Sequence, residues 1–170
     1  EPEKLLGAIG DVQIKSILIT HKHQDHLLGF DEITGAVQVP VGIGTDDADG
    51  LPSPPQIDLK DGMVIKFGNQ EMTVLDTPGH TEGATCFLIG KHLFSGDTLF
   101  PGGPGKTRSP EAFQQVVDSI TKKLLVLPDD TAVYPGHGDD TTIGKAREEY
   151  HGFASKPHSP DLFGEVTWNS

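Results

Sequence analysis

The stretch LITHKHQDHLLGF places three histidines and an aspartate directly after a run of apolar residues. The run KSILIT (15–20) has three successive large apolar side chains, which predicts a strand buried on both faces. Residues two apart in an extended segment point the same way, so His21 and His23 can converge on one ion. Asp25 and His26 lie where the chain turns and can face a second ion. We therefore interpret this stretch as a set of metal ligands.

Three further motifs place a histidine or an aspartate beside glycine at a predicted strand end. They are TPGHTEG with His80, FSGDTLF with Asp97 and YPGHGDD with His137. Taken alone, His80 or His137 is most simply a loop histidine, but the whole set predicts a metal site. Neutral imidazole and carboxylate suit zinc, iron or manganese rather than calcium. The remaining histidines lack this context and are predicted to be surface or capping residues: His92, His151 and His158.

Short apolar runs alternate with turn signals over much of the chain, which indicates many strands. Strands are predicted at 15–20, 36–43, 63–67, 70–77, 84–90, 91–98 and 131–136. Helices are predicted at 26–35, 109–127 and 141–153. Ser109 is a favourable N-cap for the second of these helices, and the proline-rich segment 45–58 is predicted to lack regular structure. This order of elements favours a layered α/β domain.

Composition restricts the partners. The chain has 170 residues, enough for one domain, and a formal net charge of −12. It has no cluster of lysine and arginine, so we expect neither nucleic acid nor an anionic membrane as a partner. Cys86 is the sole cysteine, which excludes an internal disulfide and favours a reducing, cytoplasmic location. Its apolar surroundings predict that it is a buried core residue.

The motifs, in their order, resemble those of the metallo-β-lactamase superfamily of metallohydrolases, from about Ile17 to Gly138. The resemblance implies a four-layer αβ/βα sandwich with a dinuclear metal site at one edge, between the two sheets. The implied ligands are His21, His23 and His80 for the first ion, Asp25, His26 and His137 for the second, and Asp97 as the bridge.

Within the superfamily, the chain is more similar to the glyoxalase II (hydroxyacylglutathione hydrolase) branch than to the β-lactamases. GDTLFPGGPGK resembles the stretch after the bridging aspartate in that branch. Zinc β-lactamases that bind their second ion through cysteine have that cysteine where this chain has Asp97. Lys106 stands where close relatives often have arginine, so the charge is kept but the bidentate fork is lost.

Two further departures concern the ends of the chain. Family members usually have several strands before the segment that matches KSILIT, and few residues precede it here. We therefore expect a single, N-terminally truncated domain over 1–170 with an incomplete first sheet and a C-terminal tail at 151–170. The short segment after Gly138 cannot supply the helical domain that binds glutathione in glyoxalase II.

The resemblance implies a hydrolase that uses a hydroxide bridged between two divalent ions, with zinc expected and iron or manganese as alternatives. The expected substrate is a small thioester, ester or lactone, and Asp25 would orient the nucleophile. Lys106 and Arg108 are candidates to bind an anionic group of the substrate, and a role as solvated loop charges is equally compatible with the sequence.

Two alternatives remain open at this point. Persulfide dioxygenases also resemble this sequence, and they hold one iron at positions matching His21, His80 and Asp97. The other alternative is a non-catalytic domain that binds metal. A small molecule is the expected partner, and the sequence leaves the oligomeric state undetermined.

Overall fold

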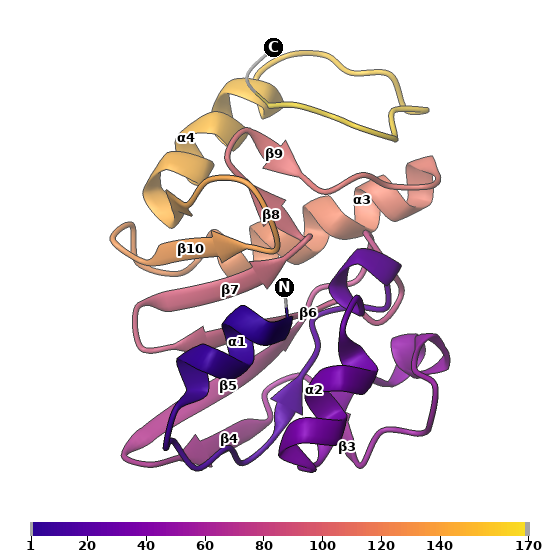
Figure 1. Cartoon of the computed structure of the whole chain (residues 1–170). Helices are drawn as coiled ribbons and strands as arrows, with labels where there is room; N and C mark the ends of the chain where they lie inside the picture. The colour runs from indigo at the N-terminus through magenta and orange to yellow at the C-terminus, as the bar shows by residue number, and fades with distance from the viewer. Residues whose placement is uncertain (1, 169–170) are drawn as a thin grey trace.

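The computed structural model describes residues 2–168, and it holds two β-sheets that pack face to face (Figure 1). The smaller sheet is parallel and has the strand order β1-β2-β3. Its strands are β1 (Ile17–Leu18), β2 (Val41–Gly44) and β3 (Ile57–Leu59). With three strands, the smaller sheet leaves β1 as an edge strand.

The larger sheet is mixed and has the strand order β11-β10-β7-β6-β5-β4. Its antiparallel meander covers β4 to β7, and β10 adds in parallel beside β7. The strands are β4 (Val64–Phe67), β5 (Gln70–Asp76), β6 (Thr85–Ile89), β7 (His92–Gly96), β10 (Ala132–Pro135) and β11 (Thr141–Thr142). A separate hairpin joins β8 (Leu99–Phe100) to β9 (Gly103–Pro104).

Helices flank the two sheets. On the side of the smaller sheet are α1 (Pro2–Ile9), η1 (Gln24–His26), α2 (Phe30–Val37) and η2 (Thr45–Gly50). On the side of the larger sheet are α3 (Pro110–Ser119), its π-helical continuation η3 (Ile120–Leu124) and α4 (Ile143–Ala154). Within residues 2–168, no helix is long and apolar enough to cross a membrane.

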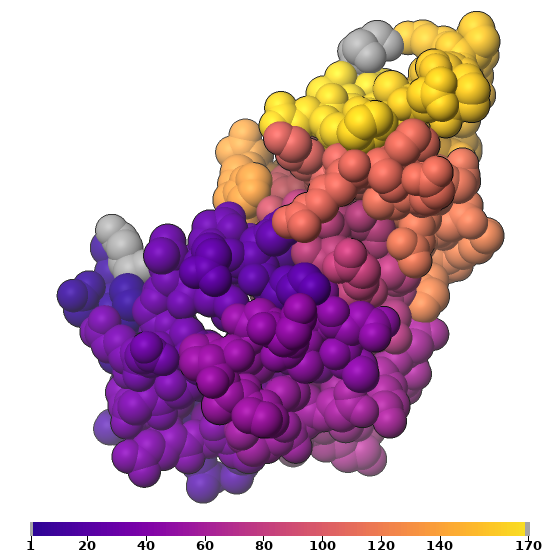
Figure 2. All heavy atoms as spheres, turned by 90° about the vertical axis from the view of Figure 1, so that its right-hand side faces the viewer, coloured from indigo at the N-terminus to yellow at the C-terminus, as the bar shows by residue number. Residues whose placement is uncertain are grey.

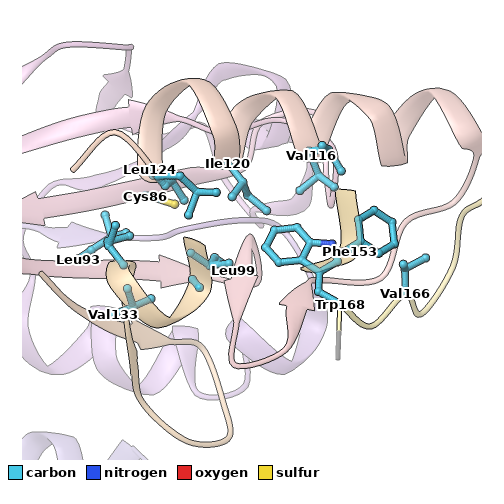
Figure 3. Close-up of a cluster of buried hydrophobic side chains, with 14 of the residues drawn as sticks. Cys86, Leu93, Leu99, Val116, Ile120, Leu124, Val133, Phe153, Val166 and Trp168 are labelled. Carbon is cyan, nitrogen blue, oxygen red and sulfur yellow. The ribbon is translucent and has the colours of Figure 1, made fainter. Parts of the chain in front are cut away.

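Three apolar clusters fill the spaces between these layers. One lies between α2 and the smaller sheet and contains the buried residues Ile19, Val41 and Ile43. Another lies between the two sheets around Leu59 and Val74. The largest lies between the larger sheet and α3, η3 and α4, as Figure 3 shows. The expected four-layer αβ/βα sandwich is therefore confirmed, because apolar packing joins each layer to the next.

Several expected boundaries were wrong, for local reasons. The helix expected at 26–35 begins at Phe30 because Gly29 has a φ of 107° and breaks the chain direction. The strand expected at 36–43 begins at Val41. The first two residues of the expected strand instead form the end of α2. That helix terminates at Gln38, which lies in the left-handed region at φ 45°. The segment 45–58 is not irregular, because it contains η2 and the start of β3.

The later helices agree better with the sequence. The Ser109 side chain caps α3 as predicted, with its Oγ accepting from the Ala112 N–H at 3.2 Å. Regular α-helix ends at Ser119 rather than at residue 127, and η3 continues the turn. Of the helix expected at 141–153, the first two residues form β11 and Thr142 caps α4.

The C-terminal segment packs against the rest of the molecule (Figure 2). α4 extends to Ala154, past residue 151 where we expected a tail to begin. Val166 and Trp168 are buried in the largest cluster, and Trp168 is only 2% exposed. The backbone N–H of Trp168 donates to the Gly102 carbonyl at 2.6 Å, and the backbone N–H of Thr107 donates to the Gly164 carbonyl at 3.1 Å. We call residues 164–168 the C-terminal strap.

Candidate metal centre

The seven predicted ligands come from four separate segments and gather at one edge of the sandwich. One segment follows β1 and includes η1, one is the turn between β5 and β6, and the other two follow β7 and β10. Because β7 and β10 are parallel neighbours, the residues after them emerge side by side. The ligands are His21, His23, Asp25, His26, His80, Asp97 and His137.

The two sheets approach each other closely at this edge. The Thr85 N–H at the start of β6 donates to the carbonyl of Thr20, two residues after β1, at 2.8 Å. Gly96 ends β7 with a φ of 48°, and a Cβ there would lie 2.6 Å from the Thr20 Cβ. Glycine at this position therefore lets the segment carrying Asp97 reach the segment carrying His21.

His21, His23 and His80 form the first group, with ligand atoms within 4.8 Å of one another. The Nε2 of His80 lies 2.9 Å from the Nδ1 of His23. The Nδ1 of His80 lies 2.8 Å from the carbonyl oxygen of Lys106, which can only accept, so this nitrogen carries the proton. The lone pair of His80 Nε2 therefore points toward His23, where both nitrogens could bind one metal ion, and a backbone carbonyl fixes the orientation of the His80 ring.

The Asp97 carboxylate stands at the centre of the histidines. Its Oδ1 lies 3.1 Å from His26 Nε2, and its Oδ2 lies 3.2 Å from His137 Nε2. The same Oδ2 is 3.6 Å from His80 Nε2 and 4.0 Å from His21 Nε2. A single carboxylate thus faces histidines of both implied ion positions, as a bridging ligand must.

The second set of ligands is more exposed. Asp25, Asp97 and His137 form one potential group, and His26 forms another with His21 and Asp97. The carboxylate of Asp25 lies 3.7 Å from His26 Nε2 and is 62% exposed. The edge of the site that carries Asp25 and His137 is therefore open to solvent, whereas His21 is buried.

Electrostatics keep the buried ligands ready to bind a cation. Burial, with the neighbouring His26 and His80, lowers the pKa of His21 to about 3. Burial also lowers the pKa of His80. Burial by itself would raise the pKa of Asp97, but contact with the His26 ring and the charges of the surrounding imidazoles lower it to about 2. At neutral pH these side chains are therefore neutral imidazoles and a carboxylate, the forms in which they bind metal.

The arrangement fits divalent ions better than it fits a closed hydrogen-bond network. Within the described residues, the buried Nε2 of His21 makes no hydrogen bond. The Oδ1 of Asp97 is also buried, and it lies near His26 Nε2 without hydrogen-bonding geometry. Buried polar atoms normally have a partner, so their convergence indicates a group that supplies one. Histidine nitrogens and a carboxylate suit zinc or iron.

Two glycines that sequence reasoning missed form a cradle around Asp97. A Cβ at Gly136 would collide with the His26 ring and the Asp97 carboxylate, and a Cβ at Gly105 would collide with the Asp97 backbone. The ligands can approach one another only if these positions lack side chains. The available signal was the position of both glycines next to predicted site residues, in YPGHG and GGPGK.

The two predicted substrate-binding residues line different cavities beside the centre. The Nη2 of Arg108 lies 3.4 Å from His23 Nε2. Lys106 lines an open cavity of about 320 Å³ that also exposes His80, Asp97 and His137. Its Nζ is 3.6 Å from the Oε1 of Glu165 in the C-terminal strap, which sequence reasoning did not connect with the site. No local signal in the sequence could place Glu165 there, because its position depends on how the C-terminal strap folds back onto the β8–β9 hairpin.

The three histidines left out of the ligand set lie elsewhere. His92 contacts the Tyr134 hydroxyl at 3.0 Å, and His151 is in the last turn of α4. His158 stacks on the Phe153 ring and contacts the Phe153 carbonyl oxygen at 2.7 Å. Cys86 is fully buried, as predicted.

Comparison with known proteins places this arrangement in a family. Residues 4–137 match the Metallo-beta-lactamase superfamily. A hydroxyacylglutathione hydrolase of Hydrogenovibrio crunogenus is 38% identical over 74% of this chain and 46% of its own length. The hydroxyacylglutathione hydrolase GloC of Haemophilus influenzae is 32% identical over 86% of this chain and 80% of its own length. Several of the curated relatives are thus much longer than this chain, which spans about half of the Hydrogenovibrio protein.

Solved structures agree with the sequence comparison. ETHE1 from Myxococcus xanthus is 29% identical with a TM-score of 0.76, covering 91% of this chain and 69% of its own. A di-iron-bound form of the protein TTHA1623 is 34% identical with a TM-score of 0.69, covering 85% and 81%. From the matched residues, the fold and the ligand arrangement together, the chain belongs to the metallo-β-lactamase superfamily.

Proposed function

We propose that this chain is a metal-dependent hydrolase that cleaves a small thioester, ester or lactone. The observation that carries the proposal is the Asp97 carboxylate, which has His26 on one oxygen and His80 and His137 around the other. A carboxylate placed between two histidine groups can bridge two adjacent divalent ions. The similarity to hydroxyacylglutathione hydrolases supports hydrolysis as the reaction.

The ligand residues have distinct parts in this proposal. His21, His23 and His80 would hold one ion, Asp25, His26 and His137 the other, and Asp97 both. When bound, the two ions would supply Lewis-acid chemistry: they would polarise a substrate carbonyl and lower the pKa of a bound water toward about 7. The chain itself lowers the pKa of His21 and of His80, which keeps these two rings unprotonated, and it fixes the ring of His80 through the Lys106 carbonyl.

Asp25 is the residue that we assign to proton handling. Its carboxylate is exposed on the open edge of the centre, within reach of the Asp97 and His137 ligand atoms. From there one of its oxygens can accept a hydrogen bond from a water and hold that water toward the substrate carbonyl. The same exposure leaves space for the substrate to approach from this side.

The surroundings favour a small substrate. The cavity beside the centre measures about 320 Å³ and is bounded by the β8–β9 hairpin and by the C-terminal strap. Besides the Asp97 carboxylate, its charged side chains are Lys106 and Glu165, which oppose each other, so the cavity wall presents no net positive site for a strongly anionic group. A short acyl thioester or a lactone suits these dimensions better than a long charged conjugate.

The test is metal content followed by turnover. We expect about two ions of zinc, iron or manganese per chain in protein purified without added metal or chelator, measured by elemental mass spectrometry. The same preparation should hydrolyse at least one of a short acyl thioester, a p-nitrophenyl ester and an acyl lactone. A preparation with two ions per chain that hydrolyses none of them contradicts the proposal, as does a chain that takes up no metal.

A second candidate is oxidation of a persulfide at a single iron. It is favoured by His21, Asp97 and His80, because both histidine Nε2 atoms lie within 4.0 Å of Asp97 Oδ2. About one iron per chain, with oxygen consumption on addition of glutathione persulfide, would select this reaction over hydrolysis. A non-catalytic metal-binding domain would take up metal and gain thermal stability without turning over either kind of substrate.

A further inference from the structure

Asp47 is a fully buried carboxylate that lies outside the ligand set. It belongs to η2, the short helix after β2, in a segment that the sequence predicted to be irregular. Its side chain has 0% exposure. A buried carboxylate is costly unless hydrogen bonds satisfy its oxygens, so its partners indicate what it does.

The partners of Asp47 come from two distant segments. Oδ2 accepts from the Lys22 backbone N–H at 3.1 Å and from the Thr81 hydroxyl at 2.6 Å. Oδ1 accepts from the Gly83 backbone N–H at 2.9 Å. The ammonium of Lys22 lies 3.7 Å from Oδ1 and places a positive charge beside the buried carboxylate. Each carboxylate oxygen is therefore satisfied, and both are directed inward.

These partners are next to the ligands of the first ion. Lys22 stands between His21 and His23, and Thr81 directly follows His80. One carboxylate thus connects the two chain segments that supply all three histidines of the first group. The hydrogen bond to the Lys22 N–H acts at the residue between two ligands, so it restrains the backbone from which both rings project.

Close packing supports the same connection. A Cβ at Gly83 would lie 2.8 Å from the Asp47 Cβ, and one at Gly50 would collide with the Lys22 side chain. A Cβ at Gly44 would collide with the Gly83 carbonyl. The three glycines let η2, the Lys22 segment and the Thr81–Gly83 turn approach one another, and Asp47 bonds to both neighbours across these contacts.

We propose that Asp47 is a positioning residue that sets the spacing of the His21, His23 and His80 rings and so controls the affinity of the first metal position. The inference rests on the metal site of the proposed function but not on the substrate. Residues that orient metal ligands typically change affinity by about 10- to 100-fold when they are removed. We expect an effect of that size here.

The experiment measures metal binding by the folded protein directly. Wild type, Asp47→Asn and Asp47→Ala are stripped of metal, confirmed as folded by circular dichroism and titrated with Zn²⁺ and with Co²⁺. We expect the tightest Zn²⁺ step to weaken by about 10- to 100-fold in Asp47→Ala and by less in Asp47→Asn, which keeps one acceptor. The visible bands of bound Co²⁺ should change in position or intensity, because they report ligand geometry.

Asp49→Asn is the matched control. Asp49 is in the same helix and contacts the Lys22 ammonium at 3.1 Å, but its side chain is 77% exposed and lies outside the segments that carry the histidines. This variant should keep the wild-type affinity and Co²⁺ spectrum. A purely structural role for Asp47 would lower the unfolding midpoint of the metal-free protein and leave affinity and spectrum unchanged, and that result overturns the proposal.

Thr81→Val provides an independent variant if Asp47→Ala does not fold. It removes one hydrogen bond on the His80 side and keeps the side-chain shape, so it should weaken Zn²⁺ binding in the same direction by a smaller factor. Wild-type affinity in both Thr81→Val and Asp47→Asn overturns the positioning role alone. Failure of the wild type to bind metal overturns the proposed function as well, so the two failures are distinguishable.

Discussion

At the scale of single residues, the centre depends on one carboxylate surrounded by imidazoles. Asp97 is 7% exposed, and contact with His26 together with the charges of other rings outweighs its burial and lowers its pKa. The carboxylate of this buried aspartate can bind a metal ion only in its ionised form. We therefore expect the identity of this residue to affect both metal binding and activity.

Replacement of Asp97 by alanine tests this dependence. We expect Asp97→Ala to lose at least one of two bound ions and all but about 1% of hydrolytic activity, because the bridging ligand is gone. Metal content and turnover should be measured on the same preparation. His92→Ala, which alters a histidine outside the centre, serves as the control and should match the wild type. Full turnover in Asp97→Ala would contradict the assignment.

Cys86 offers a second prediction at this scale. Burial raises the pKa of its thiol to about 11, although the Thr77 hydroxyl lies 3.2 Å from the sulfur. The thiolate is the reactive form, so native protein should not react with a disulfide reagent at pH 8 within hours. After unfolding in guanidinium chloride, one thiol per chain should react rapidly. Fast labelling of the native protein would show that the core around β6 opens.

At the scale of elements, α3 begins where the sequence predicted because its capping is local. The Ser109 hydroxyl accepts from the Ala112 N–H, and the loss of such a cap costs about 1 kcal/mol. We expect Ser109→Ala to lower the free energy of unfolding by about that amount in urea titrations. Ser53→Ala, in an exposed loop, should change it little. Equal stability of the two variants would show that the cap contributes nothing.

We expect the C-terminal strap to affect substrate binding through Glu165. This carboxylate faces the Lys106 ammonium beside the cavity, and both side chains are well exposed. In Glu165→Gln the positive charge of Lys106 is no longer opposed by a carboxylate. KM should therefore fall for anionic thioesters and stay constant for neutral ones, and kcat should be unchanged for both. Glu148→Gln, on an exposed position of α4, is the control. An equal change in KM for neutral and anionic thioesters would exclude an electrostatic effect.

At the scale of the whole molecule, the metal centre links segments from both sheets. Bound ions should therefore stabilise the fold by mass action, by about 2.7 kcal/mol at a free metal concentration 100 times the Kd. Removal of metal with a chelator should lower the unfolding midpoint by several degrees, and added Zn²⁺ should restore it. A midpoint that is the same with and without metal would show that the ligands bind nothing in the folded state.

The sequence by itself determined which residues gather at the centre, and all seven of the predicted ligands lie there. That part was predictable because it depends on local features: a polar ligand after an apolar strand, with glycine beside it. The cap at Ser109 and the burial of Cys86 were predictable for the same reason. Local patterns predicted less well where α2 begins, because Gly29 and Gln38 adopt left-handed conformations.

Tertiary structure alone decided how the ligands are held and what surrounds them. The burial of Asp47 between two ligand segments, the cradle at Gly136 and the pairing of Glu165 with Lys106 join residues far apart in the chain. No periodicity or spacing encodes these contacts, because they arise only when the sheets pack and the C-terminal strap returns to the β8–β9 hairpin. The residue types that gather at the site were thus predictable from the sequence, whereas their spacing and the cavity beside them depend on long-range packing.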